Sequence, residues 1–226
     1  QSQFFQPKSP EALYNINLDP HEVNDLSKSE DHEEILLQMR GLLQERISSM
    51  PDLSFYPEPY LLDNALENPT AFGQNNKAAI AELIAIADLN LSPYEKVEGK
   101  IKAALRDKNP WKRYWGLIVC SSFGMKAKEI VPQIQTILQV DQENLVRIRA
   151  AEYLMLNHIP FDKKILKILL ENADSETEAN LMLNTLSLIK EYEPNIKFNF
   201  SKEIFPAEWY DKPNDLVNRR SELLIN

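Results

Sequence analysis

The chain has 226 residues, of which 43% are hydrophobic, and it carries a formal net charge of −9 at pH 7. This length and composition are enough for a sizeable core, whereas the negative charge opposes a general nucleic-acid surface. Cys120 is the only cysteine, which excludes an internal disulfide and a zinc site built from cysteines. The low glycine content, 5 residues, favours helices, and no run of about 18 apolar residues predicts a membrane span.

The first region, residues 1–50, is predicted to contain a strand, a turn and a helix. It starts without methionine and without a signal-peptide pattern, so we expect a processed chain or a piece of a longer one. The residues that predict an edge strand are Leu13, Tyr14, Ile16 and Leu18. Ser27 and Glu30 predict a capping box before the helix. Helical spacing of apolar residues follows at Leu36, Met39, Leu43 and Ile47.

A single strand is not stable alone, so this strand needs a sheet outside the sequence. The alternative is that residues 11–26 pack on the rest of the chain as an irregular arm. The sequence ALYNINLDPHEVNDL resembles the C-terminal signature of sulfatases of the alkaline-phosphatase-like superfamily, a Leu-Tyr-Asp-Leu strand followed by Asp-Pro-x-Glu-x-x-Asn-Leu and a helix. The matching residues are Tyr14, Asp19, Pro20, Glu22 and Leu26, and the departures are Asn15 and Asp25.

The resemblance is to exported sulfatases of the Bacteroidetes type, and it has several implications. It implies an upstream sulfatase catalytic domain as a partner, with its divalent cation, calcium, held in that domain and no cofactor in this chain. It also implies a periplasmic or extracellular location. The formylglycine-forming pattern Cys-x-Pro/Ala-x-Arg is absent around Cys120, which we expect to be a core residue.

Residues 51–74 lose helical periodicity and contain Pro51, Pro57, Pro59 and Pro69. Because apolar residues such as Phe55 persist there, we predict a linker that packs on the fold. In the similar sulfatases a linker with a Pro-Glu pair, here Pro57 and Glu58, leads into helical repeats.

Residues 75–193 predict a succession of short amphipathic helices that must stack to bury their apolar faces. Internal repetition supports stacking: Asp107 and Asp141 are 34 residues apart, as are Arg113 and Arg147. A degenerate third copy carries Asp174. An apolar helix, Asp, a turn, Arg, a small residue and a second helix resemble HEAT repeats, which implies a curved α-solenoid whose Asp and Arg side chains link neighbouring repeats.

One cluster is a candidate interaction surface: Trp111, Lys112, Tyr114 and Arg149. Aromatic and basic side chains together can bind anionic sugars. The alternative, which we favour, is that Trp111 packs on the adjoining region and Trp115 fills the core. We find no catalytic or metal-binding pattern, because His21, His32 and His158 are far apart.

The last region, residues 194–226, predicts a capping tail with a short helix through Leu216 and Leu223, anchored by Phe205, Trp209 and Tyr210. The sequence therefore predicts a mainly α fold, a HEAT-like α-α superhelix preceded by a short strand-turn-helix remnant of a sulfatase α/β domain. The expected function is that of a non-catalytic C-terminal region that braces a sulfatase and contacts a sulfated glycan or a protein subunit, with no nucleic acid. The alternative is a free-standing HEAT-type scaffold that binds a protein.

Overall fold

The computed structural model describes residues 9–211 and 215–225, and this part of the chain is mainly helical with no β-strand. The helices, with short 3-10 turns between several of them, are α1 (Glu33–Ser49), α2 (Glu58–Asn64), α3 (Pro69–Asn75), α4 (Lys77–Ala87), α5 (Tyr94–Ala104), α6 (Pro110–Phe123), α7 (Val131–Val140), α8 (Asn144–Leu156), α9 (Lys164–Glu171), α10 (Glu176–Tyr192) and α11 (Leu216–Ile225). The prediction of a mainly α fold is confirmed. Over the described ranges, no helix combines the length and the apolar character needed to cross a bilayer.

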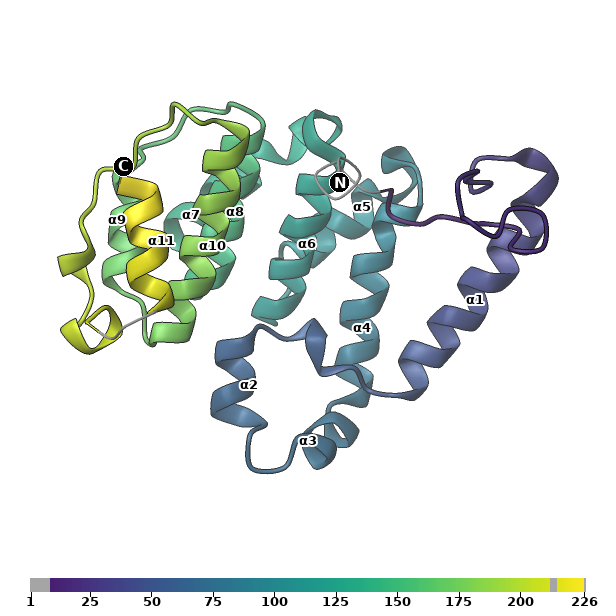
Figure 1. The fold of residues 1–226 in the computed structure, drawn as a ribbon, viewed down its shortest axis with the longest axis horizontal. Helices are drawn as coiled ribbons and strands as arrows, with labels where there is room; N and C mark the ends of the chain where they lie inside the picture. The colour runs from purple at the N-terminus through teal and green to yellow at the C-terminus, as the bar shows by residue number, and fades with distance from the viewer. Residues whose placement is uncertain (1–8, 212–214, 226) are drawn as a thin grey trace.

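Helices α4, α6, α8 and α10 form one row in which each helix contacts the next (Figure 1). Helices α5, α7 and α9 pack against this row, α5 on α6 and both α7 and α9 on α8. α11 continues the arrangement by packing on α10. Three sets of consecutive helices, α5 with α6, α7 with α8, and α10 with α11, therefore form contacting pairs, which is the arrangement that short connections favour.

Helix α8 lies at the centre of the core. Among its residues Ala150, Ala151, Tyr153 and Leu154 have no exposed surface. A helix that is apolar on most sides must be covered on most sides, and α6, α7, α9 and α10 all contact α8. Burial of each large apolar side chain stabilises the fold by about 1.5–3 kcal/mol before entropy is counted.

The helix ends follow local sequence signals. Asn109 caps α6 by accepting a hydrogen bond from the Trp111 N–H at 2.9 Å, and Pro110 follows at the first helical position. Gly124 ends the same helix with φ of +55°, a conformation that glycine adopts without strain. Ser175 caps α10 through its hydroxyl, which accepts from the Glu178 N–H at 3.2 Å.

Residues 51–74, predicted as a linker without helical periodicity, instead contain α2 and most of α3. Pro59 and Pro69 lie in the first turn of α2 and α3, where proline is tolerated, so the prolines and the short apolar runs did not reveal either helix. Aromatic side chains of the segment pack on α6. The ring centroids of Tyr60 and Trp111 lie 5.0 Å apart, and those of Phe55 and Trp115 lie 5.2 Å apart.

The predicted strand at residues 13–18 is not present, and the described residues before α1 form turns. The carbonyl of Leu13 accepts from the Leu26 N–H at 2.7 Å, and the carboxylate of Asp25 accepts from the Leu13 N–H at 3.0 Å. The segment thus closes on itself, because no neighbouring strand is available to satisfy its backbone groups. Residues 1–8 of the predicted first region lie outside the described residues.

The predicted capping box at Ser27 and Glu30 is also wrong. Helix α1 begins at Glu33, after a 3-10 turn over Glu30–His32 whose first flanking residue is Ser29. Ser27 instead donates its backbone N–H to the carboxylate of Asp25 at 2.9 Å. The serine that the pattern selected is therefore part of the preceding turn.

At the other end of the chain, α11 confirms the predicted C-terminal helix. Phe205 is buried, and its ring centroid lies 6.3 Å from that of Trp209. The ammonium group of Lys202 lies 5.4 Å from the centre of the Tyr210 ring. Residues 212–214 and 226 of the predicted tail lie outside the described residues.

Candidate functional site

The signature residues of the N-terminal region lie in one turn before α1. The carboxylate of Asp19 accepts from the backbone N–H groups of Val23 and Asn24 at 2.8 and 2.7 Å. Glu22 has φ of +53°, a conformation that costs energy for a residue with a side chain. Pro20 is exposed, and Tyr14 and Leu26 are half-buried. Asp19 therefore fixes the turn and has its oxygen engaged with backbone, as a structural role requires.

Trp111 and Tyr114, two members of the candidate interaction cluster, are buried at 5% and 7% exposure. Trp111 packs on Tyr60 of α2, and the indole N–H of Trp115 donates to the carbonyl of Phe55 at 2.8 Å. The rings are therefore used to attach residues 51–76 to α6. Trp115 is partly buried against the core instead of filling it.

The basic members of the cluster are also engaged within the fold. Lys112 donates to Asp107 at 3.1 Å and forms an ion pair with Glu82 at 2.7 Å. The hydrogen bond to Glu82, followed by that to Asp107, raises the pKa of Lys112. This cation therefore connects α4 to the start of α6.

Arg149 donates to the hydroxyl of Tyr114 at 2.9 Å, forms an ion pair with Glu152, and lies 5.1 Å from the centre of the Tyr114 ring. These contacts join α8 to α6 and occupy most of the guanidinium group, although its buried Nε lacks a partner within the described residues. The cluster thus lies inside the fold, and an external ligand would have to displace these contacts.

The two arginines that recur 34 residues apart, Arg113 and Arg147, make different contacts in the structure. Arg113 binds both carboxylate oxygens of Asp141, at 2.6 and 2.7 Å, and also donates to the Asp107 carbonyl at 2.8 Å. This bidentate pair joins one helix pair to the next. Arg147 instead donates to the carbonyl of Leu138 at 2.9 Å, within its own pair.

Acidic side chains gather beside this junction. Burial, and then the charges of Glu178, Asp141 and Asp174, raise the pKa of Glu143 to about 7. Burial also raises the pKa of Glu178, whose carboxylate accepts from the Asp174 N–H at 2.6 Å. Within the described part of the chain, no group of three or more His, Cys, Asp and Glu side chains has an arrangement that could hold a metal ion.

Cys120 is fully buried, and burial raises the pKa of its thiol to about 12. A thiol that is neither ionised nor accessible is not a nucleophile at neutral pH, so Cys120 is a core side chain.

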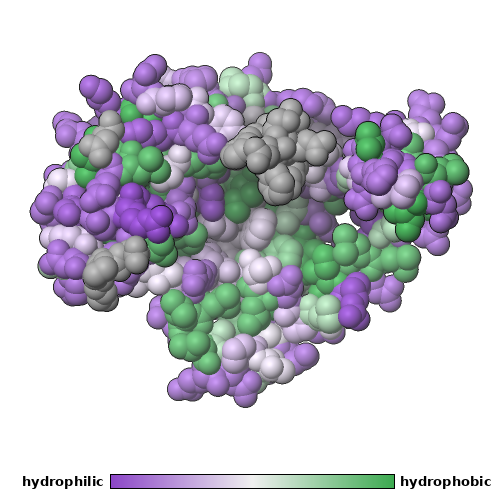
Figure 2. Space-filling model, in the orientation of Figure 1, coloured by the Kyte–Doolittle hydropathy of each residue, from purple (hydrophilic) through white to green (hydrophobic). Residues whose placement is uncertain are grey.

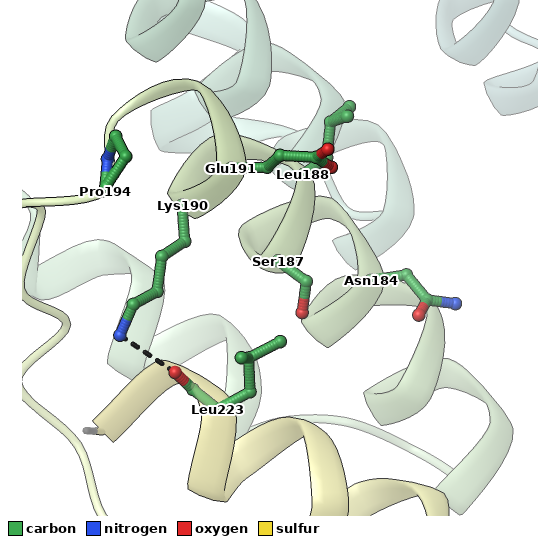
Figure 3. A pocket seen from close by; sticks show the side chains of 7 residues that line it. All are labelled: Asn184, Ser187, Leu188, Lys190, Glu191, Pro194 and Leu223. Atoms are coloured by element: carbon green, nitrogen blue, oxygen red, sulfur yellow. Dashed lines mark hydrogen bonds between the residues drawn. The ribbon is translucent and has the colours of Figure 1, made fainter. Parts of the chain in front are cut away.

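A pocket of about 650 Å³ lies on the exposed surface between α10 and α11 and is drawn in Figure 3. Three polar side chains of its wall, those of Asn184, Ser187 and Lys190, are engaged within the protein. The ammonium of Lys190 donates to the Leu223 carbonyl at 2.8 Å, and the hydroxyl of Ser187 donates to the Leu183 carbonyl at 2.9 Å. Asn184 accepts from Arg220. What remains open is mainly apolar surface, including Leu188, so the pocket suits an apolar side chain better than it suits a reaction.

The described helices define the class, a mainly α protein of paired helices. No family model, curated protein or solved structure matches the chain. The class is therefore defined by these helices and not by a relative.

The structure brings together a set of lysines that no sequence pattern singled out. A single groove is lined by Lys163, Lys164, Lys167 and Lys197. The first three follow helical spacing at one end of α9, which was a usable signal, but Lys197 reaches the groove only through the return of the chain after α10.

Proposed function

We propose that this chain is the non-catalytic C-terminal region of a sulfatase, a hydrolase of sulfuric esters, in which residues 9–50 dock on an upstream catalytic domain. The helix pairs then form a HEAT-like curved stack that braces this domain and shapes access to its substrate. The calcium ion and the formylglycine nucleophile belong to the upstream domain, and the whole protein is exported to the periplasm or the cell surface. The sequence resemblance at Tyr14, Asp19, Pro20, Glu22 and Leu26 supports this proposal.

The observation that carries the proposal is the exposure of α1. None of its 17 residues is buried. Its side chains form two adjacent apolar stripes, because residues three and four apart share a helix face. One stripe includes the half-buried Leu36 and Ile47, and α1 contacts α4. The second stripe, which we call the open stripe, consists of Ile35, Met39 and Leu42, which are 48%, 52% and 59% exposed.

The residues before α1 also expose apolar side chains. Ile16, Leu18 and Val23 are 65%, 84% and 75% exposed. Figure 2 shows green, apolar spots among the purple, hydrophilic surface of this N-terminal segment. A segment that exposes this many large apolar side chains is typical of an interface, so a partner that covers residues 16–42 is the simplest physical account of it.

The first test is to read the codons upstream of Gln1. The proposal expects an open frame that encodes Cys-x-Pro/Ala-x-Arg several hundred codons earlier, and hydrolysis of an aryl sulfate by the longer polypeptide but not by this chain. A stop codon immediately upstream would contradict it.

A second test concerns the open stripe. In the longer polypeptide, the triple variant Ile35→Ser, Met39→Ser, Leu42→Ser should detach residues 9–50 from the catalytic domain and increase their hydrogen exchange. The matched control replaces exposed apolar residues elsewhere by serine: Leu66, Met125 and Val140. Equal exchange of residues 9–50 in both variants would show that the open stripe does not dock.

The second candidate is a free-standing scaffold that binds a protein. The apolar pocket between α10 and α11 favours it, because a partner side chain could enter there. This reading expects residues 11–50 of the isolated chain to resist proteolysis, whereas the sulfatase reading expects rapid cleavage. Limited proteolysis of the isolated chain separates the two.

A further inference from the structure

A groove of about 520 Å³ lies between α9 and the segment that follows α10, residues 197–200. Its volume falls within the range of about 300–1,000 Å³ that is usual for small-ligand sites. The residues that line it are Asp162, Lys163, Lys164, Leu166, Lys167, Ile168, Glu171, Lys197, Phe198, Asn199 and Phe200. We call this site the lysine groove.

The sequence determines why lysines face the groove. Ile165, Leu166, Leu169 and Leu170 bury one face of α9, which leaves Lys163, Lys164 and Lys167 exposed. In the opposite wall, buried and exposed side chains alternate along residues 196–200. Ile196, Phe198 and Phe200 are buried, and Lys197 and Asn199 are exposed between them. Helix and extended segment thus bring four lysines to the same groove.

The acidic residues of the groove only partly offset these charges. Glu171 forms an ion pair with Lys167 at 3.4 Å, and Asp162 accepts from the backbone N–H of Lys164 at 3.0 Å. In the described residues, the ammonium groups of Lys163, Lys164 and Lys197 make no ion pair. The groove therefore has an excess of positive charge on a chain whose net charge is −9.

The position of Lys163 and Lys164 adds to this excess. Both lie at the N-terminal end of α9, where the helix dipole is positive and disfavours cations. Their placement therefore contributes little to folding, and a bound anion would relieve the repulsion. A second groove of about 500 Å³ is also lined by Lys163 and Lys197, so the positive surface extends beyond one pocket.

These observations point to an extended anionic ligand, and we infer that the lysine groove binds a segment of a sulfated oligosaccharide. Sulfate groups would bind the ammonium groups, and the sugar rings would lie along the exposed part of Ile168, which is 47% exposed. Single-stranded nucleic acid is disfavoured because Phe198 and Phe200 are 8% exposed and offer no ring face on which bases could stack. The anionic character of the ligand follows from the lysines, whereas the choice of a sulfated sugar rests on the proposed function.

The test measures binding of dextran sulfate oligosaccharides to this chain by isothermal titration calorimetry. Replacing Lys163, Lys164, Lys167 and Lys197 by glutamine should raise Kd about tenfold or more, because several exposed ion pairs of small individual contribution are lost together. Binding should weaken with added salt, and unsulfated dextran should not bind.

The control variant replaces four exposed lysines on other elements by glutamine, which changes net charge by the same amount: Lys96, Lys100, Lys126 and Lys128. Its Kd should stay within about twofold of the unmodified chain, because these charges lie outside the groove. Equal weakening in both variants would overturn the inference by showing attraction to charge alone. Thermal melting of each variant establishes that it is folded.

Further outcomes separate this inference from the proposed function. If an oligothymidylate binds through the same lysines more tightly than dextran sulfate, the ligand is nucleic acid and the inference is overturned. If dextran sulfate binds through the groove while the upstream codons lack the sulfatase pattern, the groove is an anion-binding site and the sulfatase proposal fails. If the pattern is present and dextran sulfate does not bind, the sulfatase proposal stands and the groove inference fails.

Discussion

Helices α1 and α10 have the same length, 17 residues, and both contain leucine, isoleucine and methionine at helical spacing. The side chains that α10 buries are Glu178, Ala179, Met182, Leu183, Thr185, Leu186 and Ile189, whereas α1 buries none. The difference lies in their neighbours. α10 packs on α8 and α11, whereas the main helix that α1 contacts is α4. Apolar spacing alone therefore does not decide burial, since a helix face is buried only if another element covers it.

The largest effect that tests this comparison is expected in the core. Leu154 in α8 has no exposed surface, so Leu154→Ala should lower the free energy of unfolding by about 2–5 kcal/mol. Leu42 in α1 is 59% exposed, and Leu42→Ala should change it by less than about 0.5 kcal/mol. Urea unfolding of this chain measures both values. A cost for Leu42→Ala as large as that for Leu154→Ala would break the comparison.

The next effect concerns the ion pair between helix pairs. Arg113→Ala should lower the free energy of unfolding by about 2–4 kcal/mol, because it leaves the nearly buried carboxylate of Asp141 without its bidentate partner. Lys102→Ala, which removes an exposed pair with Glu98 inside α5, should cost at most about 0.5 kcal/mol. Equal losses in urea unfolding would show that the Arg113 pair contributes no more than a surface pair.

A smaller effect should depend on pH. The pKa of Glu143 is raised from 4.5 to about 7, so its neutral form favours the folded state. This stabilisation is complete below pH 4.5 and is lost as pH rises through about 7. Glu143→Gln should therefore raise the free energy of unfolding by about 1–2 kcal/mol at pH 8, after allowance for partial exposure, and change it little at pH 4.5. Glu129→Gln, at an exposed position, is the control. A gain that is equal at both pH values would argue against this account.

The smallest effect is expected in α1. A Cβ atom at Gly41 would meet nothing within 4 Å, so Gly41→Ala should stabilise the helix by about 1 kcal/mol and slow amide exchange in α1 about fivefold. The urea midpoint of the core should stay unchanged, because α1 adds no buried residue. At Gly116 in α6 a Cβ would lie 3.0 Å from Cδ2 of Leu105, so Gly116→Ala should bring no comparable gain. Faster exchange in α1 after Gly41→Ala would contradict this prediction.

Sequence reasoning succeeded where local signals agree with packing. The stripes that contain Ile80 and Leu83, and Ile134 and Leu138, predicted helices whose apolar faces are buried. It failed where a signal has two structural meanings. Pro59 and Pro69 were interpreted as linker residues, although proline also begins helices.

The candidate interaction cluster was predictable only in composition. Trp111, Tyr114 and Arg149 were identified as neighbours one repeat apart, and the structure indeed brings Tyr114 and Arg149 together. Their burial depends on α2, which packs Tyr60 over Trp111, and nothing in residues 109–116 encodes that contact.

The sequence by itself determined the helical class and the positions of the main helices, because the spacing of apolar residues and helix capping are local properties. It also placed the recurring Asp and Arg residues near the turns between helices. The tertiary structure decided which partner each arginine binds: Arg113 binds the carboxylate of Asp141, whereas Arg147 donates to the Leu138 carbonyl. It also decided that Lys197 joins the lysines of α9 and that α1 keeps an open stripe. These contacts join residues far apart in the chain, and their geometry depends on how whole helices pack.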